Sequence, residues 1–247
     1  MRRLREETPG LYHYHLMLRA ALVCLMLWKA IRGQWGHAGL CLLTLLLFSA
    51  PALWERITAL RVPPLLELCL TLFALCANMG GEMLGFYLRF PWWDAVLHVL
   101  WGFLAGLMGC SLLSALQGQT LRPLAGALTA LAFAALTGIC WEFFEYFMDS
   151  VFSMDMQKDA WLSAVSSVLL DPEGRNAAVT VSAQSVTVNG EAWPGFLDPG
   201  LRDTVSDLFQ SFLGSVLCAL ALLWEGRGGS LRLLRALYPT PFPHHKG

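Results

Sequence analysis

The chain has 247 residues, of which 56% are hydrophobic and only 14% are charged, and its formal net charge is −1. Its mean hydropathy of +0.53 is a value that soluble globular domains rarely reach, so the composition argues against a soluble enzyme and for an integral membrane protein. The balanced charge gives no sign of a nucleic-acid partner.

Long apolar runs follow one another along the chain. A hydrocarbon core about 30 Å thick needs roughly 20 predominantly apolar residues per helix. We therefore predict an all-α integral membrane fold with about six transmembrane helices in one bundle. In the first run, Arg19 and Lys29 would have to reach the headgroups or pair within the bundle. The predicted helices cover residues 14–32, 38–54, 64–86, 93–117, 123–148 and 204–224.

The polar stretch before the last span interrupts this pattern. Within it, residues 160–170 form an amphipathic segment that could lie on the membrane surface or pack as a lid. Two Val-Thr-Val triplets, at 179–181 and 186–188, precede Asn189-Gly190 and predict a small β-hairpin. The expected organisation is helices one to five over residues 1–148, an extracytoplasmic β-containing insertion over 149–202, helix six over 203–226 and a cytoplasmic tail over 227–247.

The tail reads as an interfacial stretch over residues 231–237 followed by a flexible proline-rich end. The distribution of lysine and arginine predicts that both termini are cytoplasmic, because cytoplasmic loops carry the excess of these residues. That side would hold Arg2, Arg3, Arg5, Arg56, Arg61, Arg122, Arg227, Arg232, Arg235 and Lys246. The opposite side would hold fewer over a longer length, namely Lys29, Arg32, Arg89, Lys158, Arg175 and Arg202.

Several features favour packing rather than chemistry. All seven cysteines lie in apolar runs without a C-x-x-C spacing and are interpreted as small packing residues. Gly102 and Gly106 form a small-x-x-x-small spacing that lets a helix approach its neighbour closely. The sequence contains no G-x-S-x-G, H-E-x-x-H or Walker-type motif. Four tryptophans are expected to anchor the outer interface, or to form a stacking surface for a sugar or lipid headgroup: Trp92, Trp93, Trp141 and Trp161.

Polar side chains gather at the predicted outer ends of four spans, at spacings that place each set on one helix face. The sets are Asn78 with Glu82, Asp94 with His98, Glu142 with Glu145 and Asp149, and Asp203 with Asp207 and Gln210, followed by Gly214. If the sets converge, their acids outnumber the single imidazole. The excess charge would be relieved by shared protons, a bound cation or a cationic substrate group.

Simpler interpretations remain open for some members. Asp94 and Asp203 could serve as caps or first-turn acids, which helix N-termini favour. Glu142 and Glu145 lie near a predicted helix C-terminus, where the macrodipole opposes negative charge, so they are either a solvated rim or a site. Asp207 and the histidine at position 98 lie a turn deeper, where an ionisable group costs about 2.5 to 3.5 kcal/mol and normally faces a cavity or partner.

We therefore hypothesise an outward-facing divalent-cation or proton-coupled site. Oxygen-rich ligands with one imidazole suit magnesium, manganese or calcium better than a structural zinc. His98 would be a ligand or an acid/base group, oriented by the nearest acid. The candidate metal ligands are His98, Glu142, Glu145 and Asp207, the candidate catalytic residues are Asp94, His98, Glu142, Glu145, Asp203 and Asp207, and the candidate substrate contacts are Asn78, Glu82, Trp93 and Gln210.

The same residues carry a family resemblance. The order Trp93-Asp94-x3-His98, Trp141-Glu142-x2-Glu145, Met156-Gln157 and Asp203-Thr204-x2-Asp207 with Gly214 resembles the bacterial YjdF-type inner-membrane family, which itself is similar to VanZ-like membrane proteins. The resemblance spans residues 78–224 and implies a helical fold in the bacterial inner membrane and importance for the six candidate catalytic residues. It implies no reaction. The long insertion between residues 157 and 203 departs from the family pattern.

Three classes of function stay open. The first is an enzyme or binding site for a lipid-linked or envelope precursor at the outer leaflet, which the VanZ-like resemblance favours by analogy. The second is a transporter of protons, a cation or a lipid, for which deeper acids on the inner half are expected, and Glu67 is the main one. The third is a structural protein whose β insertion binds a partner. Substrate and oligomeric state are left open.

Overall fold

The computed structural model describes residues 8–183 and 185–241. Within these residues, six helices are long and apolar enough to cross a membrane, which confirms the predicted class and number of spans. They cover Pro9–Ile31, Trp35–Thr58, Pro64–Met83, Trp93–Gln117, Pro123–Phe152 and Leu201–Gly226. Four basic residues used to predict the orientation, Arg2, Arg3, Arg5 and Lys246, lie outside the described residues.

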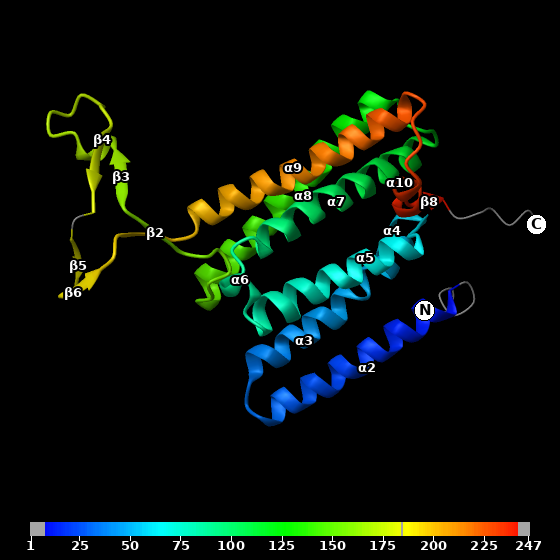
Figure 1. Cartoon of the computed structure of the whole chain (residues 1–247), viewed down its shortest axis with the longest axis horizontal. Coiled ribbons are helices and arrows are strands. Elements are labelled where there is room, and N and C mark those ends of the chain that lie inside the picture. Colours follow the sequence, from blue (N-terminus) through cyan, green and yellow to red (C-terminus); the bar gives the residue numbers. More distant parts are fainter. Residues whose placement is uncertain (1–7, 184, 242–247) are drawn as a thin grey trace, which may run out of the picture. The chain divides into compact units, whose positions relative to one another are not determined.

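The chain divides into two compact units, one comprising Met1–Gly138 with Phe209–Gly247 and the other Ile139–Leu208. In the first unit, α2, α3, α5 and α7 run side by side (Figure 1). Its helices are α2 (Pro9–Ile31), α3 (Trp35–Leu47), α4 (Ala50–Thr58), α5 (Pro64–Ala74), the π-helix η1 (Leu75–Met83), α6 (Phe86–Arg89), α7 (Trp93–Gln117), α8 (Pro123–Phe152), α9 (Leu201–Gly226) and α10 (Arg232–Leu237). Of these, α8 and α9 continue into the second unit. The second span is thus α3 with α4, and the third is α5 with η1.

Helix α7 is the most enclosed of the spans. Half of its most apolar window is buried, against 11% for α2, so α7 is central and α2 is peripheral. Leu104, Leu107 and Cys110 of α7 pack in one apolar core with Val62 and Leu66. Because lipid tails are as apolar as these side chains, their packing stabilises the bundle through van der Waals contacts and not through release from water.

Close contact between α7 and α9 depends on glycine. A Cβ at Gly102 would collide with the backbone of Ser211, and a Cβ at Gly214 would collide with the backbone carbonyl of Val99. One turn along α7, a Cβ at Gly106 would come within 3.1 Å of a cysteine side chain on α9. The predicted packing role of the small-residue spacing is confirmed, since only hydrogen side chains allow the two backbones to approach so closely.

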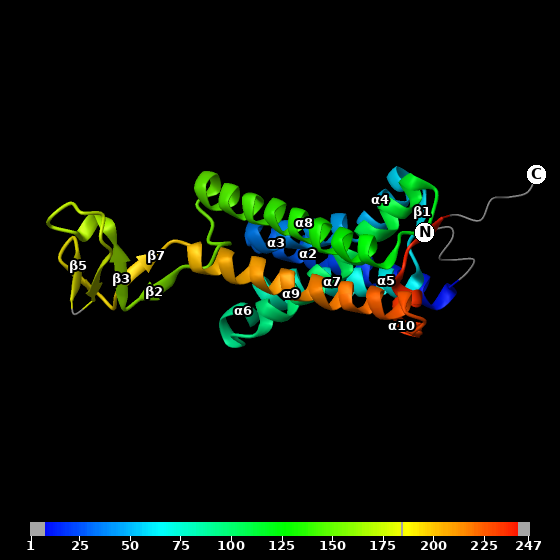
Figure 2. The same ribbon diagram turned by 90° about the horizontal axis from the view of Figure 1, so that it is seen from above.

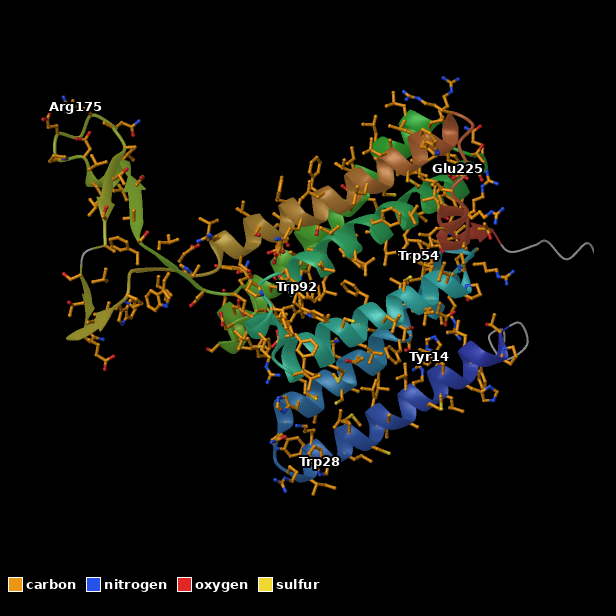
Figure 3. The ribbon with its side chains drawn as sticks, viewed as in Figure 1. Tyr14, Trp28, Trp54, Trp92, Arg175 and Glu225 are labelled. Carbon is orange, nitrogen blue, oxygen red and sulfur yellow. The ribbon has the colours of Figure 1, made fainter. Side chains whose placement is uncertain are left out.

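Aromatic residues surround the turn between η1 and α7. The Trp93 indole Nε1 donates a hydrogen bond to the Cys76 carbonyl at 3.3 Å, and its ring lies beside Gly80. Trp28 near the end of α2 and Trp92 just before α7 are 53% and 55% exposed (Figure 3), as expected for anchors at a membrane interface. Trp93 is therefore a packing residue, whereas Trp92 fits the predicted anchoring role.

The segment after α9 docks onto the bundle. Leu234 and Leu237 of α10 are 3% and 4% exposed and belong to the apolar core around α7. Strand β8 (Thr240–Pro241) pairs antiparallel with β1 (Leu60–Arg61), and the Ser111 hydroxyl donates to the Pro239 carbonyl at 2.7 Å. Leu234 and Leu237 are thus part of the core, and the segment over residues 231–237 is more than an interfacial stretch.

The second unit carries the insertion, whose short strands form separate pairs (Figure 2). The predicted hairpin is present between β5 and β6, where Asn189 and Gly190 have φ angles of 50° and 87° suited to a two-residue turn. The elements are β2 (Ala160–Leu162), β3 (Ala164–Ser167), the 3-10 helix η2 (Val168–Leu170), β4 (Val179–Ser182), β5 (Val186–Val188), β6 (Glu191–Trp193) and β7 (Phe196–Asp198), with β2 paired to β7 and β3 to β4.

One detail of the insertion differs from expectation. The segment over residues 160–170 forms strands β2 and β3 with η2, because each strand finds a hydrogen-bonding partner later in the chain. Trp161 packs edge-on against Trp193 within the insertion, and its role at the outer interface remains a prediction. In the following loop, the Asp171 carboxylate accepts several backbone hydrogen bonds that fix the turn. The bond from the Glu173 N–H contributes most to lowering the pKa of Asp171.

We expect Gly214→Ala and Gly102→Ala to lower the melting temperature of the purified protein, because each new methyl group collides with backbone that cannot move aside. Overpacking of this kind costs about 1 to 3 kcal/mol. The matched control is Gly39→Ala, since a Cβ at Gly39 meets nothing within 4 Å. Equal melting temperatures for all three variants would contradict this account of the α7–α9 contact.

A second prediction concerns α10. Leu234→Ala should destabilise the protein by about 2 to 5 kcal/mol, because a buried leucine leaves a cavity when truncated. Leu233→Ala is the control, since Leu233 is 64% exposed on the same helix. Chemical unfolding in detergent measures both, and comparable losses would show that α10 is not packed as described.

Candidate carboxylate site

Three buried acids meet within the second unit. Glu142 and Glu145 of α8 and Asp207 of α9 each offer one carboxylate oxygen, and these oxygens lie within 4.8 Å of one another. The three residues are only 5%, 8% and 3% exposed, so they are not a solvated rim. We call them the carboxylate cluster.

Helix geometry explains why these acids face one another. Glu142 and Glu145 are three residues apart on one face of α8, and Asp207 lies in the second turn of α9. Helix α8 continues to Phe152, one turn beyond the predicted end, so both glutamates lie further inside the helix than the sequence suggested. A buried carboxylate away from a helix N-terminus gains no help from the helix dipole.

Trp141 orients one member of the cluster. Its indole Nε1 donates to Glu145 Oε1 at 2.8 Å, from one turn earlier on α8. Trp141 was expected at the membrane interface, and its contact with Glu145 was not predicted. The i, i+4 spacing of an indole donor and a carboxylate acceptor was the signal that could have revealed it.

A short loop clamps the end of α8 to the start of α9 within the second unit. Asp149 accepts hydrogen bonds from the backbone N–H groups of Met156 and Gln157 at 2.7 and 2.8 Å. The Gln157 amide donates to Thr204 Oγ1 at 2.5 Å, and the Lys158 backbone N–H donates to Asp203 Oδ2 at 2.8 Å. The clamp holds the two helices that carry the cluster at a fixed separation.

Asp203 contacts the loop. Among the described residues, it is not a member of the group of three close carboxylates. Its carboxylate accepts a hydrogen bond from the loop backbone, next to Thr204 at the start of α9. The catalytic role of Asp203 remains a prediction.

His98, in the first unit, has a polar neighbour on each side of its ring. His98 Nε2 lies 3.5 Å from Asp94 Oδ1, four residues earlier on α7. On the other side of the ring, His98 Nδ1 lies 3.4 Å from the Ser211 hydroxyl of α9. Ser211 was missed by the sequence analysis, although it follows Asp207 by one turn and so shares its helix face.

The candidate substrate contacts are mostly engaged by the protein. Asn78 donates from η1 to the buried Thr44 hydroxyl at 3.1 Å, and Trp93 is engaged with the η1 backbone. Glu82 is exposed and Gln210 is partly buried. Asn78 and Trp93 thus have evident packing roles, and their predicted role in substrate binding remains a prediction.

Carboxylates at these separations repel one another when all are ionised, and the repulsion grows as water is excluded. Two arrangements relieve it: protons shared among the acids, or a cation bound between them. Carboxylate oxygens are the ligands preferred by calcium, magnesium and manganese. The cluster can therefore hold such a cation or act as a proton store.

A family described as "Predicted membrane protein (DUF2238)" matches residues 14–227. The match includes the carboxylate cluster and all six spans apart from residues 9–13 at the start of the first one. No curated protein matches the chain. No solved structure matches it either. Since the match covers most of its length, the chain belongs to the DUF2238 family of multi-pass membrane proteins.

Proposed function

We propose that this protein binds a divalent cation at Glu142, Glu145 and Asp207 and uses the site to act on a lipid-linked or envelope substrate. The observation that carries the proposal is the convergence of three carboxylates that are each less than 10% exposed. Three such groups are rarely gathered for stability alone, because like charges that lose water destabilise the fold. Buried acids gathered in this way are candidates for a functional site.

The chemistry of the cluster favours a hard cation. Its three members supply only oxygen, and neither a thiolate nor a second imidazole is needed. Such an ion would offset most of the negative charge of the three acids and polarise a phosphate or carbonyl oxygen of a substrate. His98 as a further ligand or acid/base group, with Asp94 orienting it, remains part of the proposal, supported by the Asp94 contact within the first unit.

The proposed substrate class rests on the family resemblance and on the position of the site in the spans. The proposed kinship with YjdF-type and VanZ-like membrane proteins favours an envelope component by analogy. A site at the ends of apolar spans is suited to a substrate whose lipid part stays in the bilayer while its polar part reaches the acids.

We also propose that the protein lies in a bacterial inner membrane with both ends of the described chain cytoplasmic. The even number of six candidate spans supports placing these ends on one side. Arg56, Arg61, Arg122 and Arg227 then flank the cytoplasmic ends of spans, as the positive-inside rule requires. The insertion and the carboxylate cluster would face outward.

One observation favours the alternative of a proton-coupled transporter. Glu67 is 7% exposed within α5 and lies 3.7 Å from a buried histidine of α2. Deep acids are a common feature of proton pathways. This alternative and the cation site use different residues and can be tested apart.

We expect purified protein to bind manganese or magnesium, and Glu145→Gln and Asp207→Asn to weaken that binding by about tenfold or more, since even outer-shell changes cost 10- to 100-fold. Titration calorimetry in detergent measures the affinity. Binding should also fall at acidic pH, because protonated carboxylates are poor ligands. If wild-type protein binds neither ion, the proposed cation site is wrong.

Two further variants sharpen this measurement. Glu191→Gln is the matched control, because Glu191 is an exposed acid of the same unit and should not affect affinity. His98→Gln tests the predicted fourth ligand: a loss comparable to that of Asp207→Asn supports it. An unchanged affinity would leave His98 outside the metal site.

The orientation has its own test. Alkaline phosphatase, which is active only outside the cytoplasm, should be active when fused after Arg175 and inactive when fused after Arg227. Arg175 lies in the exposed loop of the insertion (Figure 3), so a fusion there does not interrupt a span. The opposite pattern of activity would invert the proposed topology.

A further inference from the structure

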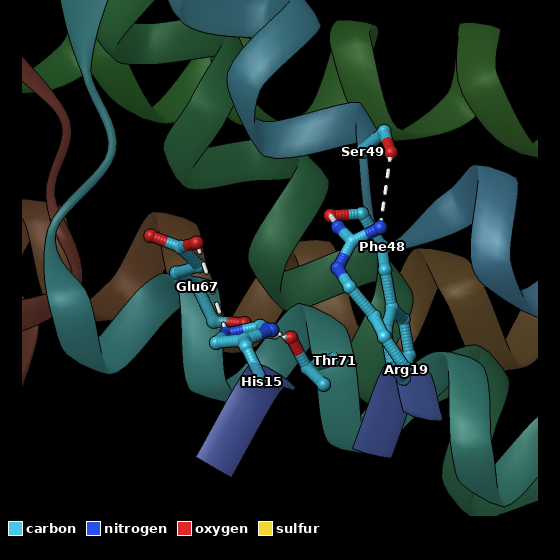
Figure 4. Close-up of polar contacts among 6 residues, drawn as sticks. All are labelled: His15, Arg19, Phe48, Ser49, Glu67 and Thr71. Atoms are coloured by element: carbon cyan, nitrogen blue, oxygen red, sulfur yellow. Dashed lines mark hydrogen bonds and ion pairs between the residues drawn. The ribbon is translucent and has the colours of Figure 1, made fainter. Parts of the chain in front are cut away.

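A second polar group lies inside the first unit, and the proposed cation site does not use it. His15 and Arg19 are one turn apart on α2, while Glu67 and Thr71 are one turn apart on α5 (Figure 4). His15, Glu67 and Thr71 are only 1%, 7% and 2% exposed. Ionisable side chains in apolar spans are costly, at about 2.5 to 3.5 kcal/mol for a charged residue, and normally have a partner or a function.

Arg19 has a structural explanation. Its Nη2 donates to the Phe48 carbonyl at 2.7 Å, and its Cζ lies 5.7 Å from the centre of the Phe48 ring. Arg19 was expected either to reach the headgroups or to pair within the bundle, and it pairs within the bundle. The guanidinium fastens α2 to the junction of α3 and α4, which leaves the histidine and the glutamate to be explained.

The neighbours of His15 define where its ring carries a proton. The Thr71 hydroxyl donates its only hydrogen to the Glu67 backbone carbonyl at 2.8 Å, so it can only accept from His15 Nε2, which lies 3.5 Å away. The Glu67 carboxylate Oε1 lies 3.7 Å from the same nitrogen. Two acceptors at Nε2 indicate that the neutral ring carries its hydrogen there.

The other ring nitrogen is the unusual one. Within residues 8–183 and 185–241, the buried His15 Nδ1 has no hydrogen-bond partner. In the Nε2–H tautomer this atom presents a lone pair, which is the one position of the ring that can take up a further proton. A buried polar atom left in this state calls for an explanation.

Three groups from the surrounding helices decide whether a proton can bind there. The Glu67 carboxylate on α5 attracts the imidazolium that would form, and the Arg19 guanidinium on α2 opposes it. From α3, the Phe48 ring packs edge-on at 6.0 Å and does not titrate. Burial of the ring opposes the charge as well. Among the described residues near the ring, the Glu67 carboxylate at 3.7 Å is the group that favours proton uptake.

We propose that His15 and Glu67 form a proton-binding site inside the membrane-spanning bundle. A proton from water adds to the lone pair of His15 Nδ1, no bond of the protein breaks, and the new positive charge is balanced by the Glu67 carboxylate. The occupied state is an ion pair and the empty state holds a neutral imidazole. The site belongs to the first unit and is independent of the carboxylate cluster.

Nitrogen-15 NMR of histidine-labelled protein in lipid nanodiscs tests the proposal, because it distinguishes the two neutral tautomers from the imidazolium. The chain has six histidines, and His15→Asn identifies the His15 signal by its loss. We expect an Nε2–H ring at high pH that converts to imidazolium on acidification while the protein stays folded. Glu67→Gln should weaken the proton affinity of His15 by about tenfold, which is one pH unit.

Two controls separate this site from other effects. His13→Asn removes an exposed histidine two residues away, and Glu142→Gln changes the proposed cation site. Neither should move the His15 transition. If His15 stays neutral across the folded range, carries its hydrogen on Nδ1 at high pH, or titrates identically in Glu67→Gln, the proposal is overturned. The first two outcomes are read from the wild-type titration and do not depend on Glu67→Gln. They need only His15→Asn, which assigns the signal.

Discussion

The constraint on which this structure depends is that the interior of a bilayer offers no water to a polar group. Every polar side chain in the spans must find its partner within the protein or remain costly. The Arg19 guanidinium meets the Phe48 carbonyl, Asn78 meets the Thr44 hydroxyl, and Trp93 meets the Cys76 carbonyl. These contacts fix the helices in register where apolar side chains alone would let them slide.

The buried acids of α8 and α9 differ from these paired polar residues. Arg19, Asn78 and Trp93 each donate to a neutral acceptor, whereas Glu142, Glu145 and Asp207 lie near one another. The surrounding contacts hold them there: Trp141 binds Glu145 from the same helix, and the loop clamp joins the ends of the helices that carry the acids. An arrangement in which neighbours preserve an unfavourable cluster is characteristic of a site that needs that cluster.

The number of spans and part of the carboxylate cluster could be predicted from the sequence. The period and length of the apolar runs specify six helices, and the helical spacing of the acids places Glu142 and Glu145 on one face. The role of Asp203 could not be predicted, because its partner is a backbone N–H of a loop whose course depends on the whole insertion. The His15–Glu67 contact was missed for a related reason: an isolated histidine in an apolar run has no pattern, and its partner lies on a helix two elements away.

The docking of α10 has a consequence for how the protein assembles. Leu234 and Leu237 fill part of the core formed by Val62, Leu66 and Leu107, yet they follow all six spans in the chain. Domains form largely in the order in which the ribosome supplies them. The third and fourth spans must therefore wait in the bilayer with an incomplete apolar face until α10 has been synthesised. Insertion and final packing of this protein are separate events in time.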